Sequence, residues 1–254
     1  MVKRLGKAGV IALVVLLVGA GSALALQLTL GNVVVVTDGG FTPTTLPKDH
    51  FGPIKLHGFG KISTTDGQNP PILDTLTIWF DKHGEVETRG LPVCTAGKLQ
   101  ATTPAVARKN CAGAIVGTGY GTAVIAFPEQ KPFTASSPIT IFNGPPKHGN
   151  PTVLAHAYLG VPAPTTYIVP IEIQRVNDGR YGFKTEAKIP RIAGGAGIPI
   201  YGRLKIGREW NYKGKRLSYA NAACADGRLQ GKGQFNFKDG TLLEGEIIKT
   251  CTGR

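Results

Sequence analysis

From residue 54 to residue 62, apolar or small residues alternate strictly with charged, imidazole and aromatic ones. This alternation restricts the possible folds of the chain more than any other feature of its sequence. One side of this segment is apolar or small and the other carries charged, imidazole and aromatic groups: Ile54, Leu56, Gly58, Gly60 and Ile62 against Lys55, His57, Phe59 and Lys61. A period of two residues is typical of a β-strand with one buried face. Similar alternation at 76–80 and 167–173 indicates a β protein.

Turn signals separate the predicted strands. The chain has 35 glycines and 18 prolines, which break helices and favour many short strands. Gly-containing turns at 81–84, 177–179, 212–214 and 238–240 predict four hairpins and therefore antiparallel pairing. We expect an all-β fold, an antiparallel β-sandwich, with a curved half-barrel as the alternative. At most one short helix is expected, near residues 98–109, and Pro104 weakens even that helix.

The first 25 residues have the three parts of an export signal. Lys3, Arg4 and Lys7 precede an apolar run at 10–18, and small residues at 23–25 form a cleavage site. Cleavage would leave residues 26–254 as the mature β domain, secreted or associated with the cell envelope. The alternative is an uncleaved membrane anchor, because apolar character continues to Leu30 for about 20 residues.

Four cysteines in an exported chain predict two disulfides, because thiols oxidise outside the cytoplasm. Three pairings are open. Pairing of sequence neighbours closes short loops, which favours Cys94 with Cys111 and Cys224 with Cys251. A zinc site is not expected because no two cysteines have the C-x2-C spacing.

Residues 26–254 are expected to form a single domain with a weak internal sequence repeat. A glycine precedes a cysteine by ten positions twice, at Gly84 and Cys94 and at Gly214 and Cys224. Two related halves, about 26–160 and 161–254, would explain this spacing. Chance in a glycine-rich β chain would explain it equally well.

Three segments carry a resemblance to known proteins: RGLPVC at 89–94, CAGAIVGTG at 111–119 and FNFKDG at 235–240. Together they resemble a group of exported bacterial proteins of unknown function. The resemblance spans most of the mature chain and implies export and a β fold. It implies no activity.

A formal net charge of +13 favours anionic partners. Outside a cell these partners are wall polymers, acidic polysaccharides or lipid headgroups, although solubility alone would also explain the charge. Lysine and arginine are scattered rather than gathered in runs. Specific nucleic acid binding is therefore not expected. Membrane contact is expected only if the N-terminal segment is not cleaved.

The sequence lacks the common catalytic motifs. No G-x-S-x-G elbow occurs, and the glycines of 117–121 precede a predicted strand rather than the helix that a phosphate loop requires. Glu244 and Glu246 are two apart on a predicted strand, so they would share a face about 7 Å apart, as in inverting glycosidases. Solvated strand faces produce such pairs routinely. No catalytic residue, cofactor or metal is therefore predicted.

Outward aromatic and basic side chains suit binding better than catalysis. Six residues form the candidate ligand face: His57, Phe59, Trp79, Arg208, Trp210 and Tyr212. An aromatic ring beside cations can stack on sugars or contact an amphiphile, whereas a sheet covered on both sides would make the same rings part of the core. The favoured function is an exported, non-enzymatic protein that binds an anionic polymer or an amphiphilic ligand. The rival function is a secreted hydrolase acting on envelope glycans.

Overall fold

The computed structural model describes residues 25–254. The predicted signal segment, residues 1–25, lies outside the described residues except for its last position. Within the described part of the chain, no helix is both long enough and apolar enough to cross a membrane.

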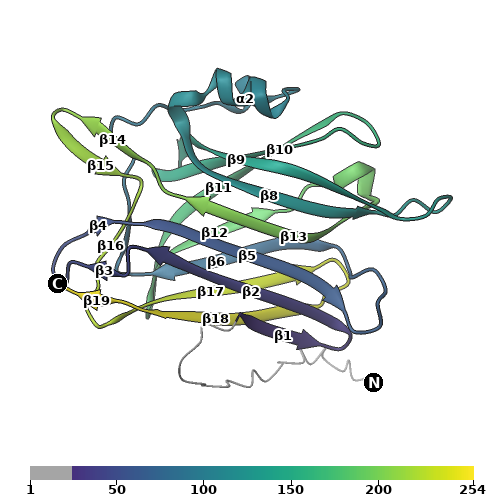
Figure 1. Ribbon diagram of the computed structural model, residues 1–254, viewed down its shortest axis with the longest axis horizontal. Helices are drawn as coiled ribbons and strands as arrows, with labels where there is room; N and C mark the ends of the chain where they lie inside the picture. Colours follow the sequence, from purple (N-terminus) through teal and green to yellow (C-terminus); the bar gives the residue numbers. More distant parts are fainter. Residues whose placement is uncertain (1–24) are drawn as a thin grey trace, which may run out of the picture.

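Twelve strands of residues 25–254 form one sheet in which every neighbouring pair is antiparallel (Figure 1). Their order across the sheet is β1 (Leu26–Leu30), β2 (Val33–Thr42), β5 (Lys55–Thr64), β13 (Gly197–Ile206), β8 (Ile115–Ile125), β9 (Phe133–Lys147), β10 (Asn150–Leu159), β11 (Thr165–Asp178), β12 (Tyr181–Lys188), β6 (Leu73–Asp81), β17 (Arg228–Phe237) and β18 (Leu242–Thr250). The predicted all-β antiparallel fold is confirmed.

Shorter elements lie around this sheet. The short strands are β3 (Thr45–Leu46) paired with β19 (Thr252–Gly253), β4 (Gly52–Pro53) and β7 (Gly84–Val86) on either side of β16 (Ala220–Ala222), and β14 (Glu209–Tyr212) paired with β15 (Lys215–Ser218). The helical segments are α1 (Ala96–Leu99), α2 (Pro104–Asn110), η1 (Ala112–Ala114) and η2 (Ile192–Gly195).

The sheet curls until its two edge strands, β1 and β18, lie side by side (Figure 1). A methyl group on Gly245 of β18 would lie 2.6 Å from Leu26 Cδ2 and 2.8 Å from Leu28 Cδ2. The missing side chain at Gly245 therefore lets the leucines of β1 pack on β18. Where β2 extends beyond β1, Lys249 Nζ of β18 lies 2.7 Å from Asp38 Oδ1 of β2 and closes the seam.

The apolar core lies inside this curl. One cluster joins the first strands to the last, as Val35 and Ile62 pack with Phe235 and Leu243. A second cluster, which includes Val116, Ile141, Ile173 and Phe183, lies under β8 to β12. Opposite walls of one continuous sheet thus pack against each other. The architecture combines the layered core of the expected sandwich with the curvature of the half-barrel alternative.

Three of the four predicted hairpins are confirmed, at 177–179, 212–214 and 238–240. In the second, Lys213 and Gly214 have φ of 49° and 77°, as a tight hairpin turn requires. The prediction at 81–84 is wrong. The chain turns there, but both edges of β6 already pair with β12 and β17, so β7 pairs with β16 instead.

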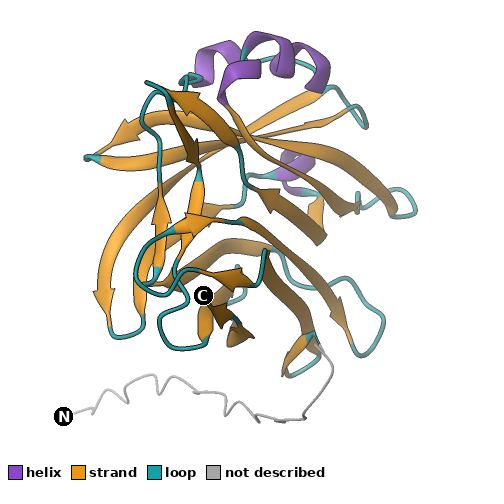
Figure 2. Cartoon of the chain, turned by 60° about the vertical axis from the view of Figure 1, so that its left-hand side comes forward, coloured by secondary structure: helices purple, strands orange, loops and turns teal. Residues whose placement is uncertain are grey.

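The segment between Cys94 and Cys111 forms a helical clip on the outer side of the sheet (Figure 2). Its side chains bury Phe142 of β9 and Leu154 of β10. The one helix expected near 98–109 is divided into α1 and α2. Pro104 begins α2, where its missing N–H leaves no hydrogen bond unmade, so proline divides the helix rather than abolishing it.

Both predicted disulfide pairings are confirmed. The Cα atoms are 5.6 Å apart in Cys94–Cys111 and 6.0 Å apart in Cys224–Cys251. No cysteine in the described chain is free. Two disulfides indicate an oxidising environment, as found outside the cytoplasm.

Strands from the two predicted halves alternate in the sheet. β13 lies between β5 and β8, and β6 lies between β12 and β17. The two halves are therefore not separate sheets. Duplication stays a prediction.

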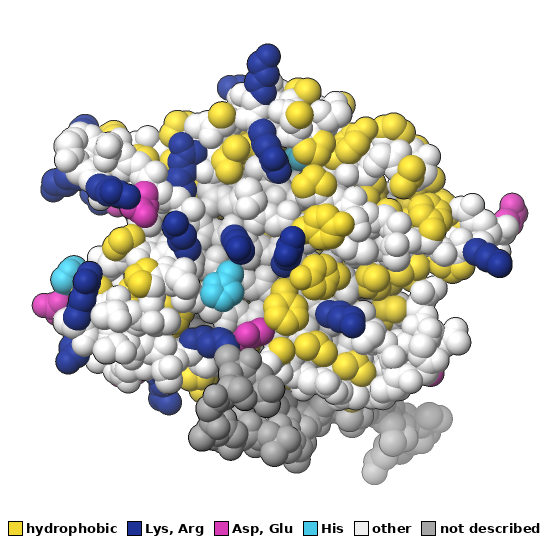
Figure 3. All heavy atoms as spheres, viewed as in Figure 1, with side chains coloured by type: hydrophobic (Ala, Val, Ile, Leu, Met, Phe, Trp, Pro, Cys, Tyr) yellow, Lys and Arg dark blue, Asp and Glu magenta, His cyan; other side chains and the backbone are white. Residues whose placement is uncertain are grey.

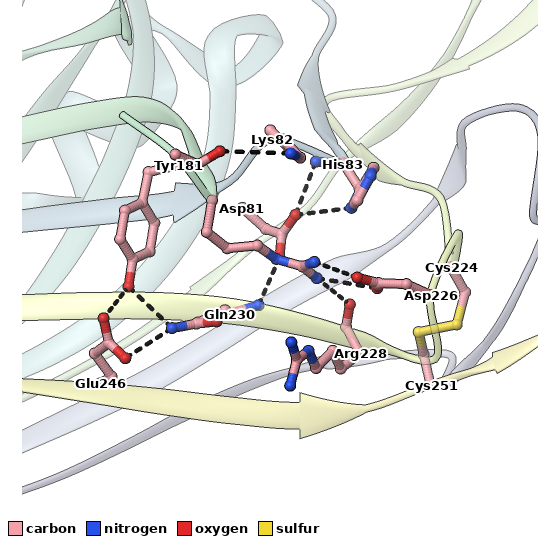
Figure 4. A network of polar contacts seen from close by, with 12 residues as sticks. Asp81, Lys82, His83, Tyr181, Cys224, Asp226, Arg228, Gln230, Glu246 and Cys251 are labelled. Atoms are coloured by element: carbon pink, nitrogen blue, oxygen red, sulfur yellow. Dashed lines mark hydrogen bonds and ion pairs between the residues drawn. A yellow bond between two sulfur atoms is a disulfide. The ribbon is translucent and has the colours of Figure 1, made fainter. Parts of the chain in front are cut away.

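A network of polar contacts holds the ends of several strands together (Figure 4). Asp81 is 5% exposed, and its carboxylate accepts hydrogen bonds from Arg180 Nε at 2.7 Å, from Gln230 N at 2.8 Å and from His83 N at 2.9 Å. The Arg180 guanidinium also pairs with Asp226, which lowers the pKa of Asp226 to about 2. The network thereby ties β6, the β11–β12 turn and β17 to the loop that follows Cys224.

Replacing Arg180 should test this network. Arg180→Met removes the arginine partner of the buried Asp81 carboxylate, so we expect the free energy of unfolding to fall by about 3 kcal/mol. Urea denaturation followed by circular dichroism measures the change. Glu186→Gln removes one side of the exposed Lys184–Glu186 pair and should cost less than about 0.5 kcal/mol. Equal stability of the two variants would contradict a structural role for Arg180.

His156 lies fully buried beneath the clip. Its Nε2 atom is 3.2 Å from both Thr102 Oγ1 and the Thr102 carbonyl oxygen, whereas Nδ1 has no hydrogen-bond partner. Burial lowers the pKa of His156 below its usual value of 6.5. Arg108 donates to Thr140, the residue of β9 that lies opposite His156. Its guanidinium adds a positive charge near the histidine.

This neutral histidine should make the protein less stable in acid. The unfolded chain protonates this histidine near pH 6.5, whereas the folded chain does so only at lower pH, so stability should fall as pH drops below 6.5, by up to about 1.4 kcal/mol per pH unit. Urea denaturation at pH 7.5, 6.5 and 5.5 measures the slope. His156→Gln should flatten it and His50→Gln, at an exposed histidine, should not. An unchanged slope in His156→Gln would refute the assignment.

Candidate functional site

The outer side of β5, β13 and β8 carries three rows of side chains in register. His57, Lys205 and Thr118 form the first row, Phe59, Arg203 and Tyr120 the second, and Lys61, Tyr201 and Thr122 the third. We call these nine residues, together with Lys55 and Arg208 at the end of the first row, the basic-aromatic face.

Alternation along each strand explains why these side chains point outward. In β13, Leu204 and Ile206 contact the inner core cluster, so Tyr201, Arg203 and Lys205 face the opposite side. The inward positions beside them include Gly60 and Gly202. A methyl group on Gly60 would lie 3.7 Å from the Phe235 ring, which places Gly60 on the core side.

Positive charge gathers on this face without local compensation. Within residues 25–254, no acidic side chain lies within 4.0 Å of the charged nitrogens of Lys55, Lys61, Arg203, Lys205 or Arg208. Asp38, the acidic residue opposite Phe59 on β2, is paired with Lys249. The face therefore has five cations without an acidic partner in the described chain.

Aromatic rings lie between these cations. The centroids of the Phe59 and Tyr201 rings are 6.4 Å apart, with a 30° angle between the ring planes. The Arg203 guanidinium lies 5.8 Å from the centroid of Tyr120. Phe59 and Tyr201 are partly exposed, and Tyr120 is exposed.

An open groove of about 750 Å³ lies at the first row, between β5, β13 and the start of β8. Lys55, His57, Lys205 and Arg208 contribute to its lining. Figure 3 shows this side of the molecule hollowed at its centre, with basic side chains around the hollow and hydrophobic ones beside it.

Local contacts fix the groove. Arg208 donates hydrogen bonds from Nη1 to the carbonyl oxygens of Ala112 at 3.2 Å and Ile115 at 2.9 Å, which holds η1 against the end of β13. The His57 ring lies across Gly40 of β2. A methyl group there would be 3.0 Å from His57 Nε2, so Gly40 gives the imidazole its place.

Only part of the predicted ligand face is brought together. His57, Phe59 and Arg208 lie on the basic-aromatic face. Trp79 of β6 lies between β12 and β17, where Lys232 Nζ is 4.1 Å and Lys184 Nζ is 5.5 Å from its ring centroid. Two cations of the protein itself therefore contact this ring.

Trp210 and Tyr212 belong to the β14–β15 hairpin. Trp210 Nε1 donates to the Arg89 carbonyl oxygen at 3.0 Å. Tyr212 packs on Gly90, which has a φ of 71° and where a methyl group would lie 2.0 Å from Tyr212 Cδ2. These two rings anchor the hairpin to the segment before Cys94.

The paired carboxylates lie on one face of β18 as predicted, but both are engaged. Glu244 accepts from Gln234 Nε2 at 2.8 Å and lies 3.7 Å from Lys232 Nζ. Glu246 accepts from Tyr181 Oη at 2.6 Å. Burial, together with this bond, raises the pKa of Tyr181. Both carboxylates are thus part of a hydrogen-bonded network that joins β18 to β17 and β12.

No metal cluster accompanies these groups. Among the described residues, no three His, Cys, Asp or Glu side chains lie close enough together to hold a metal ion.

The ligand face predicted from the sequence contained three of the eleven members of this face and missed the other eight. Tyr201, Arg203 and Lys205 alternate with Gly202, Leu204 and Ile206, so a period of two was available to find them. Tyr120 lies in the glycine-rich segment at 117–121, which resembles a phosphate loop but precedes a predicted strand. What the sequence lacked was the pairing that joins β13 to β5 and β8.

No protein-family model matches this chain, and no curated protein or solved structure is significantly similar to it.

Proposed function

We propose that this protein is an exported, non-enzymatic binding protein that holds an anionic polymer on its basic-aromatic face. The ligand would be a polymer of the cell envelope or the extracellular space. The observation that carries the proposal is the gathering of five cations without acidic partners on one open side of the sheet.

Some cations of the described chain pair with acidic side chains, although exposed pairs add little stability. Arg89 with Glu87 and Arg216 with Glu209 are examples elsewhere in the described chain. On the basic-aromatic face, Asp38 lies opposite Phe59 and is bound by Lys249. A positive potential is thereby left open to solvent, which favours association with a polyanion.

Export is supported by two independent features. The disulfides fit an oxidising compartment. The first strand begins at Leu26, directly after the predicted cleavage site at residues 23–25. Cleavage there would leave β1 whole.

A binding role is favoured over hydrolysis of glycans by the state of the carboxylates. An inverting glycosidase needs one carboxylic acid and one carboxylate free to act on either side of the sugar. Glu244 and Glu246 instead accept hydrogen bonds from neighbouring side chains of the fold. Neither residue lines the groove.

Neutralising the face should weaken binding of polyanions. We expect the combined variant Lys61→Ala, Arg203→Ala and Lys205→Ala to lose on the order of tenfold or more in affinity for sodium polyphosphate and for polygalacturonate at low salt. The wild-type affinity should also fall as salt rises. Isothermal titration calorimetry of the purified protein measures both effects, with neutral dextran as the ligand that should not bind.

The matched control removes the same number of charges from hairpin turns. Lys131, Lys147 and Lys238 are exposed and lie in or beside the turns that follow β8, β9 and β17. Their combined replacement by alanine should change the affinity less than twofold to threefold, about the effect of a general change in net charge. Equal losses in both triple variants would mean that binding follows net charge rather than this face.

A further inference from the structure

We propose that the ligand of the basic-aromatic face is an acidic polysaccharide, whose sugar rings stack on Phe59 and Tyr201 while its acidic groups pair with Lys61, Arg203 and Lys205. This inference rests on the proposed function and narrows it to one class of polymer. The alternation of rings and cations across two strands carries it.

Rings and cations alternate in both directions on β5 and β13. Phe59 lies directly opposite Arg203, and Lys61 lies directly opposite Tyr201. The two rings therefore occupy one diagonal of this square and the two cations occupy the other. Opposite positions are about 5 Å apart and successive outward positions about 7 Å apart. The distance from each ring to a cation is thus no greater than about the length of one sugar unit.

The rings have the geometry of a shared platform. Their centroids are 6.4 Å apart at a 30° tilt, so they lie side by side rather than stacked face to face on each other. Both are partly exposed on the outer side of the sheet. The apolar C–H face of a pyranose can cover such a ring, because its slightly positive hydrogens meet the negative face of the π-system.

A polymer without rings would leave this platform unused. Polyphosphate can pair with lysine and arginine, but it has no apolar surface to place on Phe59 and Tyr201. An acidic sugar offers both an apolar face and a charge on each unit. The alternation of the face therefore matches the polysaccharide better than it matches a simple polyanion.

Single-stranded nucleic acid also combines rings with charge, but the face suits it less well. Proteins bind splayed bases by stacking them on open aromatic faces. Of the three phenylalanine and tyrosine rings on this face, Tyr120 already has the Arg203 guanidinium 5.8 Å from its centroid, which leaves only Phe59 and Tyr201 open to bases. The groove, where an unstacked base could insert, has no aromatic ring in its lining apart from the imidazole of His57.

Hydroxyl groups border the platform on the side of β8 and β9. Thr122 Oγ1 and Ser136 Oγ lie 3.0 Å apart, and Thr118 is exposed in the first row. Hydroxyls both donate and accept hydrogen bonds, so they complement the hydroxyls of a sugar. At the other end, Lys55 and Arg208 extend the line of cations into the groove.

The test removes the rings and keeps the charges. The variant Phe59→Ala with Tyr201→Ala should bind polygalacturonate about tenfold more weakly, which corresponds to about 1.4 kcal/mol. Its affinity for polyphosphate should change less than twofold, because every cation remains. Isothermal titration calorimetry at one fixed salt concentration measures both affinities, and circular dichroism verifies that the variant is folded.

Two further variants separate stacking from other effects. Phe59→Tyr keeps a ring at the same position and should bind polygalacturonate like the wild type. Trp79→Ala removes an aromatic ring from another part of the sheet, beside Lys184 and Lys232, and should leave the affinity unchanged. A loss in Trp79→Ala as large as that in the double variant would overturn the assignment of the platform.

The remaining outcomes are distinct from one another. Equal weakening for polygalacturonate and polyphosphate in the double variant would refute stacking and leave a simple polyanion site. Tighter wild-type binding of oligothymidylate, lost together with the rings, would assign the face to nucleic acid instead. If the wild type binds neither polymer, the proposed function itself fails.

Discussion

Contact between the two edge strands is the constraint on which the rest of the molecule depends. This sheet buries its apolar side by packing its first strands against its last ones, which brings its edges together, and here β1 is too short to cover the whole of β2. Leu26 and Leu28 close one part of the seam over Gly245, and the Lys249–Asp38 ion pair closes the next. The same ion pair occupies the carboxylate of Asp38, which lies opposite Phe59. The Lys249–Asp38 ion pair therefore both closes the sheet and leaves the cations of its outer side without this carboxylate.

Local patterns were enough to predict several strands, three hairpins and the disulfide pairing, because these depend on residues close together in the sequence. Period-two segments and glycine-containing turns located the hairpins after β11, β14 and β17. The order of strands could not be predicted in this way. β13 enters between β5 and β8 because its two edges pair with strands more than 70 residues away. The false hairpin at 81–84 has the same cause, since distant strands took both edges of β6.

The candidate site was predicted in part. An outward position in a strand can be recognised from its neighbours, which is how His57 and Phe59 were found. What contacts an outward ring is a matter of tertiary structure. The ring of Trp79 meets two lysines from adjacent strands, and Tyr212 packs on the backbone at Gly90. Composition could not distinguish these satisfied rings from the open pair formed by Phe59 and Tyr201.

Glycines on the inner side of β5, β13 and β8 have a consequence for how this protein could change over time. Behind the outer rows, inward positions such as Gly60 of β5 and Gly202 of β13 have no side chain to fill the core. Substitutions in the outer rows can therefore accumulate without disturbing what lies beneath them. Descendants of one ancestral fold could exchange these nine side chains and acquire different ligands, while the curl, the seam and the two disulfides pass unchanged from one to the next.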